Sequence, residues 1–364
     1  MIIKDITNYL EELAPLNYAE DFDNVGLLVG NYTTEVSGVL VTLDTLEETV
    51  DEAIANNCNL IVSFHPIIFG GLKKLNGNSY VERVVLKAIQ NNIAIYATHT
   101  ALDNSKKGVS AKMCEVLGLE NTKILIPKKG IIKKLTTFVP TKNATALRNS
   151  LFEAGAGNIG NYDNCSFNIT GEGTYRGNEN SNPTLGEKEK LHTEKETQIS
   201  VVFESKNEAA ILKTLQQNHP YEEVSYQLVT TENIHQDIGM GMIGELTSEM
   251  DETTFLLYLK KTMKTDCVRH SNLINKKIKK VAVLGGSGSF AISNAKRAGA
   301  DAYVSADFKY HEFFKAENSI LLADIGHYES EQFTKNLLVD YLTKKFSNFA
   351  VILSEKSTNP IYYI

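Results

Sequence analysis

Three of the eight histidines in this chain stand where an apolar, strand-like segment stops. His65 follows NLIVSF, His99 follows IAIYAT and His327 follows SILLADIG. In two of these places a carboxylate comes four residues later, as Asp103 in HTALD and Glu331 in HYESE. If HYESE opens a helix, this spacing puts His327 and Glu331 on one helix face, where both can reach one ion. The pattern predicts a site made of imidazole and carboxylate groups.

Imidazole nitrogen and carboxylate oxygen are donors that suit zinc, manganese or iron(II). A single histidine at a strand end is more often a hydrogen-bonded structural residue, but four such groups together favour a divalent metal site. The four cysteines form no CxxC pair, which argues against thiolate ligands and against a disulfide framework. We therefore expect the metal ligands to be His65, Asp103, His327 and Glu331.

Alternating strand-like and helix-like segments must position these groups. Apolar segments such as GVLVTLD, NLIVSFH and IAIYATH alternate with amphipathic ones early in the chain, and KKVAVLGG, DAYVSAD and SILLADIG repeat the rhythm late. This order predicts a mostly parallel sheet with helices on both faces, whose ligands gather at the carboxyl ends of the strands. We expect residues 1–125 and 233–364 to form one discontinuous, two-lobed α/β domain.

The stretch between these halves, residues 126–232, has a different order of elements. Its segments read β-α-β-β-α-β, from KKLTTFVP to VSYQLVTT, which predicts an inserted ferredoxin-like α+β domain. Within it, GEGTYRGNENSNPTLGEKEKLHTEKE is almost free of apolar residues, so we expect an exposed hairpin or mobile loop with His192 at the surface.

The composition is that of a globular protein, and at 364 residues two domains are the default expectation. The N-terminal segment lacks the pattern of a signal peptide, and no apolar run approaches the ~18 residues of a membrane span. We expect a cytoplasmic protein without a membrane segment. A formal charge of −7 opposes a broad nucleic-acid-binding surface.

Several motifs together resemble one known family, the type 2 homologues of GTP cyclohydrolase I, also called Nif-three-like dinuclear metal proteins. The resemblance covers nearly the whole chain, and the inserted domain is similar to that of the family's longer bacterial form. The motifs are EDFDNVGLLVG, SFHPIIFGGLKKL, HTALD, VAVLGGSGSF, DAYVSADFKYHE and GHYESE in the two halves, and GAGNIGNYDNCSF and HPYEEVSY in the insert.

This resemblance implies that the four expected ligands belong to a two-metal centre in which Asp103 and Glu331 bridge the ions. The family usually has two adjacent histidines before the proline, but this chain has Phe64 in the first position, followed by His65. A phenyl ring donates nothing to a cation, so we expect one tightly held ion per chain and a second, weaker one. The resemblance also implies a homo-oligomer, typically a hexameric ring.

Three further residues are candidates for catalysis. Asp307 and His311, four apart in ADFKYHE, could support a metal ligand or act as a general base, while Asp307 could equally cap a helix. His99 could approach the metal or orient Asp103, and we expect the orienting role. Asp23 and Asn24 in EDFDNVG either approach the site or form an ordinary turn.

The function predicted from these observations is that of a metal-dependent hydrolase acting on a nucleotide or another phosphorylated compound. The alternative is a non-catalytic metal-handling or regulatory protein, which the phenylalanine at position 64 makes more credible. Fold and metal do not fix a substrate, and the sequence contains no identifiable guanine-binding motif.

Overall fold

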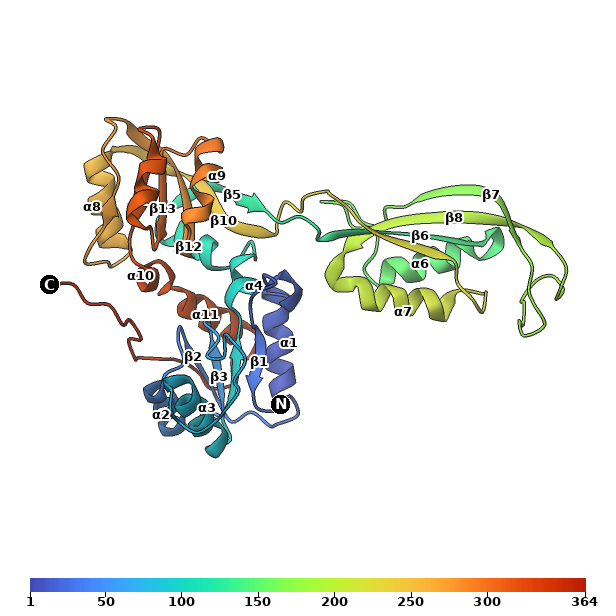
Figure 1. Ribbon diagram of the computed structural model, residues 1–364, viewed down its shortest axis with the longest axis horizontal. Coiled ribbons are helices and arrows are strands. Elements are labelled where there is room, and N and C mark those ends of the chain that lie inside the picture. Colours follow the sequence, from blue (N-terminus) through green and yellow to red (C-terminus); the bar gives the residue numbers. More distant parts are fainter. The chain divides into compact units, whose positions relative to one another are not determined.

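The computed structural model describes residues 1–364 and confirms a mixed α/β fold (Figure 1). Its internal contacts divide the chain into two compact units, Met1–Pro127 with Gln236–Ile364, and Lys128–His235. The larger unit contains two sheets, each with helices on both faces, and the inserted unit contains a third sheet. No helix is long and apolar enough to cross a membrane.

The first sheet of the larger unit has the strand order β1-β4-β3-β2-β15. Strands β2, β3, β4 and β15 are parallel, and β1 is antiparallel to β4. Three of the central strands are buried along their whole length, which is why they read as unbroken apolar runs. The strands are β1 (Gly26–Val29), β2 (Val39–Thr42), β3 (Leu60–Ser63), β4 (Ala94–Ala97) and β15 (Val351–Leu353).

Alternate residues of these strands pack against helices on opposite faces. One face buries Leu60 and Val62 against α1 (Ile3–Leu13) and α11 (Thr334–Lys345). The other buries Ile61 against α2 (Glu47–Ala55) and α3 (Tyr80–Gln90). The two short helices after β4 are α4 (His99–Asp103) and α5 (Val109–Val116).

The second sheet has the order β11-β14-β13-β12-β10-β5, in which only β12, β13 and β14 are parallel. The expectation of mostly parallel strands therefore holds for its centre, while antiparallel strands form both edges. Its strands are β5 (Leu119–Pro127), β10 (Gly239–Asp251), β11 (Arg269–His270), β12 (Lys277–Ser287), β13 (Ala302–Ala306) and β14 (Leu321–Asp324). Its helices are α8 (Glu252–Thr262), α9 (Ile292–Arg297), the 3-10 segment η5 (Tyr310–Ala316) and α10 (His327–Glu331).

The inserted unit has the element order β-α-β-β-α-β and a four-stranded antiparallel sheet of order β7-β8-β6-β9. One face of the sheet packs on both helices through a core that includes Leu135, Ile199 and Leu215. The polar stretch near its middle is the long hairpin of β7 and β8 with its connecting loop. The elements are β6 (Ile132–Pro140), α6 (Ala144–Glu153), β7 (Phe167–Tyr175), β8 (His192–Glu204), α7 (Glu208–Asn218) and β9 (Tyr226–Thr230).

Candidate metal centre

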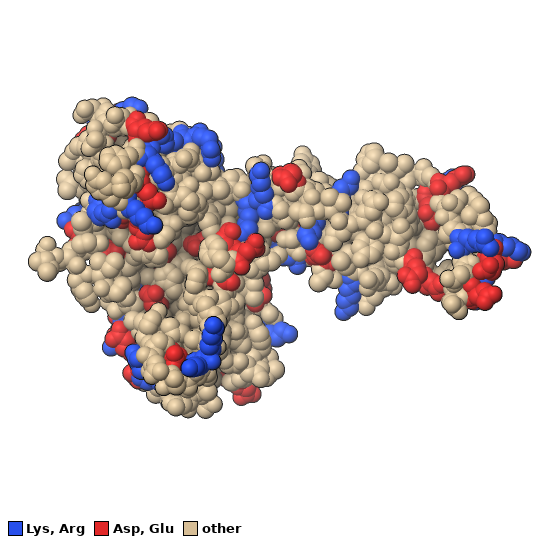
Figure 2. Space-filling view, viewed as in Figure 1, with Lys and Arg blue, Asp and Glu red and all other residues tan.

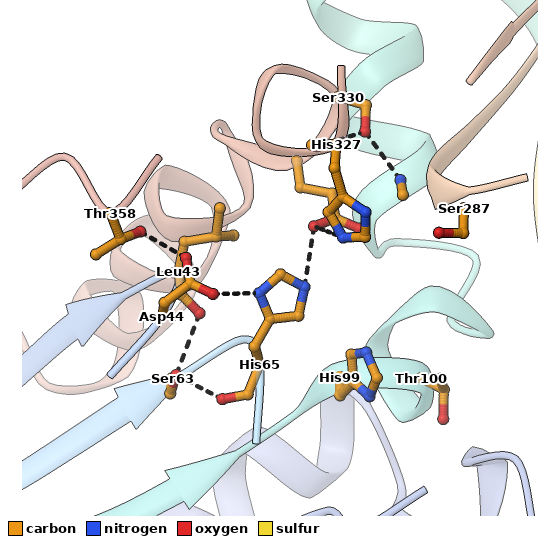
Figure 3. A network of polar contacts seen from close by, with 12 residues as sticks. Leu43, Asp44, Ser63, His65, His99, Thr100, Ser287, His327, Ser330 and Thr358 are labelled. Atoms are coloured by element: carbon orange, nitrogen blue, oxygen red, sulfur yellow. Dashed lines mark hydrogen bonds and ion pairs between the residues drawn. The ribbon is translucent and has the colours of Figure 1, made fainter. Parts of the chain in front are cut away.

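His65 lies two residues beyond β3, at the carboxyl end of the first sheet. Its backbone N–H donates to the Leu43 carbonyl at 2.9 Å, and its own carbonyl accepts from Ser63 Oγ at 2.7 Å. The ring is fixed as well, because Nδ1–H donates to Asp44 Oδ1 at 2.8 Å. Asp44 follows the neighbouring strand β2. Backbone and ring are both held, so Nε2 of His65 points in a defined direction (Figure 3).

His327 and Glu331 are the first and last residues of α10, which follows β14 of the second sheet. The helix begins after Gly326, whose φ of +93° strains any residue with a side chain. Asp307, at the end of β13, accepts a 2.7 Å hydrogen bond from His327 Nδ1–H and a second one from Ser287 Oγ. Helix α10 thus places the imidazole of His327 and the carboxylate of Glu331 on one face, next to His65.

His99 begins α4 beyond β4, and its ring is held in the same way. Its Nδ1–H donates to Asp23 Oδ1 at 2.7 Å, while Thr100 donates to Asp23 Oδ2 through its backbone N–H at 3.0 Å. Burial tends to raise the pKa of Asp23, but the hydrogen bonds from His99 and Thr100 outweigh it and lower this pKa to about 2. Asp23 therefore stays ionised and accepts the hydrogen bond from His99 at neutral pH. His99 is thus bonded to Asp23, whereas the sequence analysis expected it to orient Asp103.

The three histidines share one arrangement. Each donates Nδ1–H to an aspartate from another loop of the chain, namely Asp44, Asp23 or Asp307. In the neutral ring this leaves the Nε2 lone pair available. The His65 ring lies 5.4 Å from the rings of both His99 and His327, centroid to centroid (Figure 3). Histidine ligands of metals usually have their second nitrogen held in this manner by a carboxylate.

Three donor atoms, one from the segment after β3 and two from α10, meet beside these rings. Glu331 Oε2 lies 3.1 Å from His65 Nε2 and 3.3 Å from His327 Nε2, and one donor atom from each of the three residues lies within 4.8 Å of the others. Two donors that are each about 2.1 Å from one ion, at angles of about 90° to 110°, are about 3.0 to 3.4 Å apart. The two separations that involve Glu331 match the edges of such a coordination shell.

Glu331 Oε2 is buried, and its polar neighbours are the Nε2 atoms of His65 at 3.1 Å and of His327 at 3.3 Å. A buried carboxylate that faces two imidazole nitrogens is costly unless protons on the rings or a metal cation compensate its charge. Burial lowers the pKa values of His65 and His327, but the hydrogen bonds of His65 to Asp44, of His327 to Asp307 and of both rings to Glu331 outweigh burial and raise both pKa values. The arrangement favours positive charge at this point, and a divalent cation fits the donor set.

Asp103 lies at the end of α4, one turn after His99. It is not part of the three-donor group, so the structure gathers three of the four residues expected from the sequence. Burial raises the pKa of Asp103 well above its usual value, and the nearby charge of Glu331 raises it further. A carboxyl group in such surroundings keeps its negative charge only beside added positive charge.

Phe64 is fully buried in the core beneath the site. Its ring centroid lies 4.9 Å from the His65 ring and 5.6 Å from the His99 ring. Phe64 therefore packs directly against two of the anchored imidazoles and supplies no donor. The site is therefore bordered by an apolar ring at the position where the sequence analysis expected a missing ligand.

The other candidates from the sequence lie in different surroundings. Asp307 holds His327, so it has the supporting role and is not a helix cap. His311 is exposed on η5 and contacts the aromatic rings of Tyr310 and Phe314. Asn24 donates to the Ile68 carbonyl at 2.5 Å and ties the segment after His65 to the turn that carries Asp23.

Sequence reasoning missed two residues that support the site, Asp44 and Thr358. Asp44 could have been found by applying the strand-end rule to GVLVTLD, because that segment ends on it. Thr358 lies in the irregular C-terminal segment and donates to Asp44 Oδ2 at 2.5 Å. No local pattern marks Thr358.

Comparisons with known proteins agree over the whole chain. The family model described as Duf34/NIF3 (NGG1p interacting factor 3) matches residues 1–360. A Bacillus subtilis protein named GTP cyclohydrolase 1 type 2 homolog is 35% identical over 99% of this chain and 98% of its own length. A Staphylococcus epidermidis protein of the same name is 34% identical over the full length of both. The crystal structure of a Bacillus cereus protein related to NIF3 superposes with a TM-score of 0.83 at 34% identity, covering 100% of this chain and 99% of that one.

Proposed function

Because the chain belongs to the Duf34/NIF3 family, we propose that it is a divalent-metal-dependent hydrolase whose substrate is a nucleotide or another phosphorylated small molecule. The proposal rests on one observation above all. Glu331 Oε2 is buried between the Nε2 atoms of His65 and His327, at 3.1 Å and 3.3 Å. Because Nδ1–H of each ring is already donated to an aspartate, this convergence needs compensating positive charge, which either ring protons or a metal cation supplies.

We propose His65, His327 and Glu331 as the ligands of the tightly bound ion. Asp103 would bridge toward a second, weaker ion, with His99 as the available imidazole on that side. Nitrogen and oxygen donors of this kind suit zinc, manganese or iron(II). A bound ion of this class supplies Lewis acidity and makes hydroxide available near neutral pH.

The chain's own residues would orient the reacting groups. Asp44 and Asp307 hold the tautomers in which Nε2 of His65 and of His327 faces the site. His99 is the imidazole outside the three-donor group, and when no second ion occupies its Nε2 this nitrogen would accept a proton during hydrolysis while Asp23 stabilises the resulting charge.

The test is an activity panel with protein of known metal content. Chelator-stripped protein would be reloaded with zinc, manganese or iron(II) and offered nucleoside triphosphates, nucleoside monophosphates and simple phosphoesters. GTP belongs in the panel because of the name that the relatives carry. We expect turnover that requires metal and is lost in Asp103→Ala but kept in Glu249→Gln, an exposed carboxylate on β10.

A non-catalytic metal-handling or regulatory role is the second candidate, and Phe64 favours it. The buried phenyl ring leaves the His99 side of the site with fewer donors than a complete two-metal centre needs. If metal-loaded protein binds its ion tightly but turns over no member of the panel, this second role replaces the hydrolase proposal. Assembly into a homo-oligomer stays a prediction, which a measurement of the molar mass by light scattering would test.

A further inference from the structure

The inserted unit contains an open cavity of about 650 Å³ on the sheet face opposite its helices. Its floor comes from β6, β7 and β8, and its walls are the loop after β7 and the turn before β9. A volume of this size is typical of sites for small organic ligands. Figure 2 shows acidic side chains, in red, and basic ones, in blue, around a hollow at this end of the unit. The metal site uses no residue of this unit.

Hydrogen bonds hold the cavity walls in place. The backbone N–H of Asn182 donates to Glu222 Oε1 at 2.6 Å, and Thr184 Oγ1 donates to the Pro220 carbonyl at 2.7 Å. From the strand side, the Tyr175 hydroxyl donates to the Leu185 carbonyl at 2.8 Å. The loop after β7 is therefore tied both to the turn and to the hairpin, so the cavity is formed before any ligand binds.

The turn before β9 is also fixed from beneath. His219 Nε2–H donates to the Phe138 carbonyl at 2.9 Å, and His219 Nδ1 accepts from the backbone N–H of Tyr221 at 3.1 Å. This imidazole fixes Tyr221, whose hydroxyl donates to Glu196 Oε1 at 2.8 Å inside the cavity. The Tyr175 ring meets the Tyr221 ring at 5.6 Å in an edge-on arrangement. Two aromatic rings and one carboxylate thus face the same space.

Two glycines in β7 keep the floor open. A Cβ at Gly173 would lie 2.1 Å from Glu196 Oε2, so this glycine makes room for the carboxylate. A Cβ at Gly171 would meet no atom within 4 Å, so a side chain there would project into free space. Glycine inside a strand weakens the strand and often marks the close approach of another molecule.

The charge of the lining decides what kind of ligand fits. Four carboxylates line the cavity against one cation, Arg176, which already pairs with Glu189 outside the cavity at 3.3 Å. Aromatic faces attract cations, and carboxylates do so more strongly, whereas an anion would meet repulsion here. The lining carboxylates are Glu172, Glu196, Glu222 and Glu223.

We propose that this cavity is a binding site for a small organic cation, an amine or quaternary ammonium compound. The charged nitrogen lies beside Glu196 and against the edge-on pair of rings of Tyr175 and Tyr221, and the apolar body of the ligand covers Phe138 and Ile169 on the floor. The site is independent of the metal centre, so the two proposals can fail separately.

Calorimetric titration of the full-length protein with choline and with putrescine tests the proposal and distinguishes the two kinds of cation. We expect at least one to bind saturably with a Kd below ~1 mM. The uncharged isostere of choline, in which carbon replaces the ammonium nitrogen, should bind about tenfold more weakly. Absence of saturable binding by both cations, or equal binding of the isostere, would overturn the proposal.

Two variants and one matched control locate the binding. Gly171→Val places a branched side chain in open space on the cavity floor, and Glu196→Gln removes the charge while keeping an acceptor for Tyr221. We expect each to weaken cation binding at least about tenfold. Glu153→Gln, exposed at the end of α6, should leave it unchanged.

The same variants can overturn the proposal in two ways. Cation binding that survives both cavity variants would place the ligand elsewhere on the protein. If Gly171→Val changes the oligomeric mass in light scattering and no small cation binds, the cavity receives part of a second copy of the chain.

Discussion

The hydroxyl of Thr358 donates a hydrogen bond to Asp44 Oδ2, and these two residues are 314 positions apart in the sequence. The other oxygen of Asp44 accepts from Nδ1–H of His65 at 2.8 Å. The C-terminal segment therefore helps to orient a proposed metal ligand without approaching the ion. Asn359 strengthens this attachment through a 3.0 Å bond to Glu329 on α10.

Thr358→Val should weaken metal binding, because it frees the Asp44 carboxylate to rotate away from His65. Loss of one hydrogen bond of about 1 kcal/mol corresponds to roughly a fivefold change in Kd. Asp44→Asn removes the carboxylate itself and should cost about 10- to 100-fold. Competition with a fluorescent zinc chelator measures both. Thr343→Val, exposed on α11, is the matched control, and equal affinities for the two threonine variants would mean that the tail has no orienting role.

Glu331→Gln should remove the tightly bound ion. The substitution keeps the volume of the side chain but replaces a charged oxygen donor with a neutral amide, so we expect a loss of more than about 100-fold in affinity. Elemental analysis after gel filtration gives the metal content, and the rise in Tm on adding zinc reports binding in solution. A Glu331→Gln variant that retains as much metal as Glu249→Gln would remove Glu331 from the ligand set.

The strand-end histidines could be predicted from the sequence because the apolar runs before them are buried parallel strands, which are easy to recognise. His65 and His327 meet only after two separate sheets have packed together in the larger unit, and no local pattern encodes that contact. The spacing of His327 and Glu331 did predict their common helix face. The same reasoning could not place Asp103, since the packing of α4 sets its distance from the other donors.

The strand β10 shows a second limit of local patterns. It pairs with both β5 and β12, although its glycine-rich start, GMGMIGEL, lacks the composition typical of a strand. The predicted insert spans residues 126–232, whereas the structural unit spans Lys128–His235. Element boundaries depend on tertiary pairing, so shifts of two or three residues are expected.

Deletion of the inserted unit should leave a folded metal-binding protein. Pro127 and Gly239 are paired neighbours across β5 and β10, so Pro127 can be joined to Gln236 by a short glycine linker without straining either strand. We expect one cooperative thermal transition and unchanged metal content. Loss of cooperative melting in this variant, while the intact chain melts normally, would show that the larger unit depends on the insert.

Stability of the inserted unit should fall as the pH drops through the titration range of histidine. Burial lowers the pKa of His219 below its usual value, outweighing the bond to the Phe138 carbonyl and the charge of Glu196. The folded state therefore binds fewer protons here than the unfolded state, so stability is fully present above the unfolded pKa of about 6.5 and is lost below it. His219→Gln, which keeps a donor and an acceptor, should flatten the Tm against pH curve between about pH 7 and pH 5. If the Tm against pH curve of this variant is unchanged, titratable groups other than His219 cause the pH dependence of stability.

Phe64→His should raise the amount of tightly bound metal per chain. Phe64 packs against the rings of His65 and His99, so an imidazole in its place would add a donor on the side where the second, weaker ion is proposed. The change also replaces a fully buried apolar ring, so the metal-free variant should lose roughly 2–4 kcal/mol of stability. Added zinc should recover part of that loss, because binding to the folded state stabilises it.

Phe64→Leu distinguishes the effect of adding a metal ligand from the effect of losing the buried phenyl ring. It shortens the buried side chain without supplying a ligand, so it should lower stability but leave the metal content at that of the original protein. Titration of chelator-stripped samples, followed by gel filtration and elemental analysis, should give about one tight ion for the original chain and for Phe64→Leu, and a value approaching two for Phe64→His. Two equally tight ions in the original chain, with no gain in Phe64→His, would mean that another donor already completes the second position. His99 is the residue placed to do so, since its Nδ1 is held by Asp23 and its ring lies 5.4 Å from that of His65.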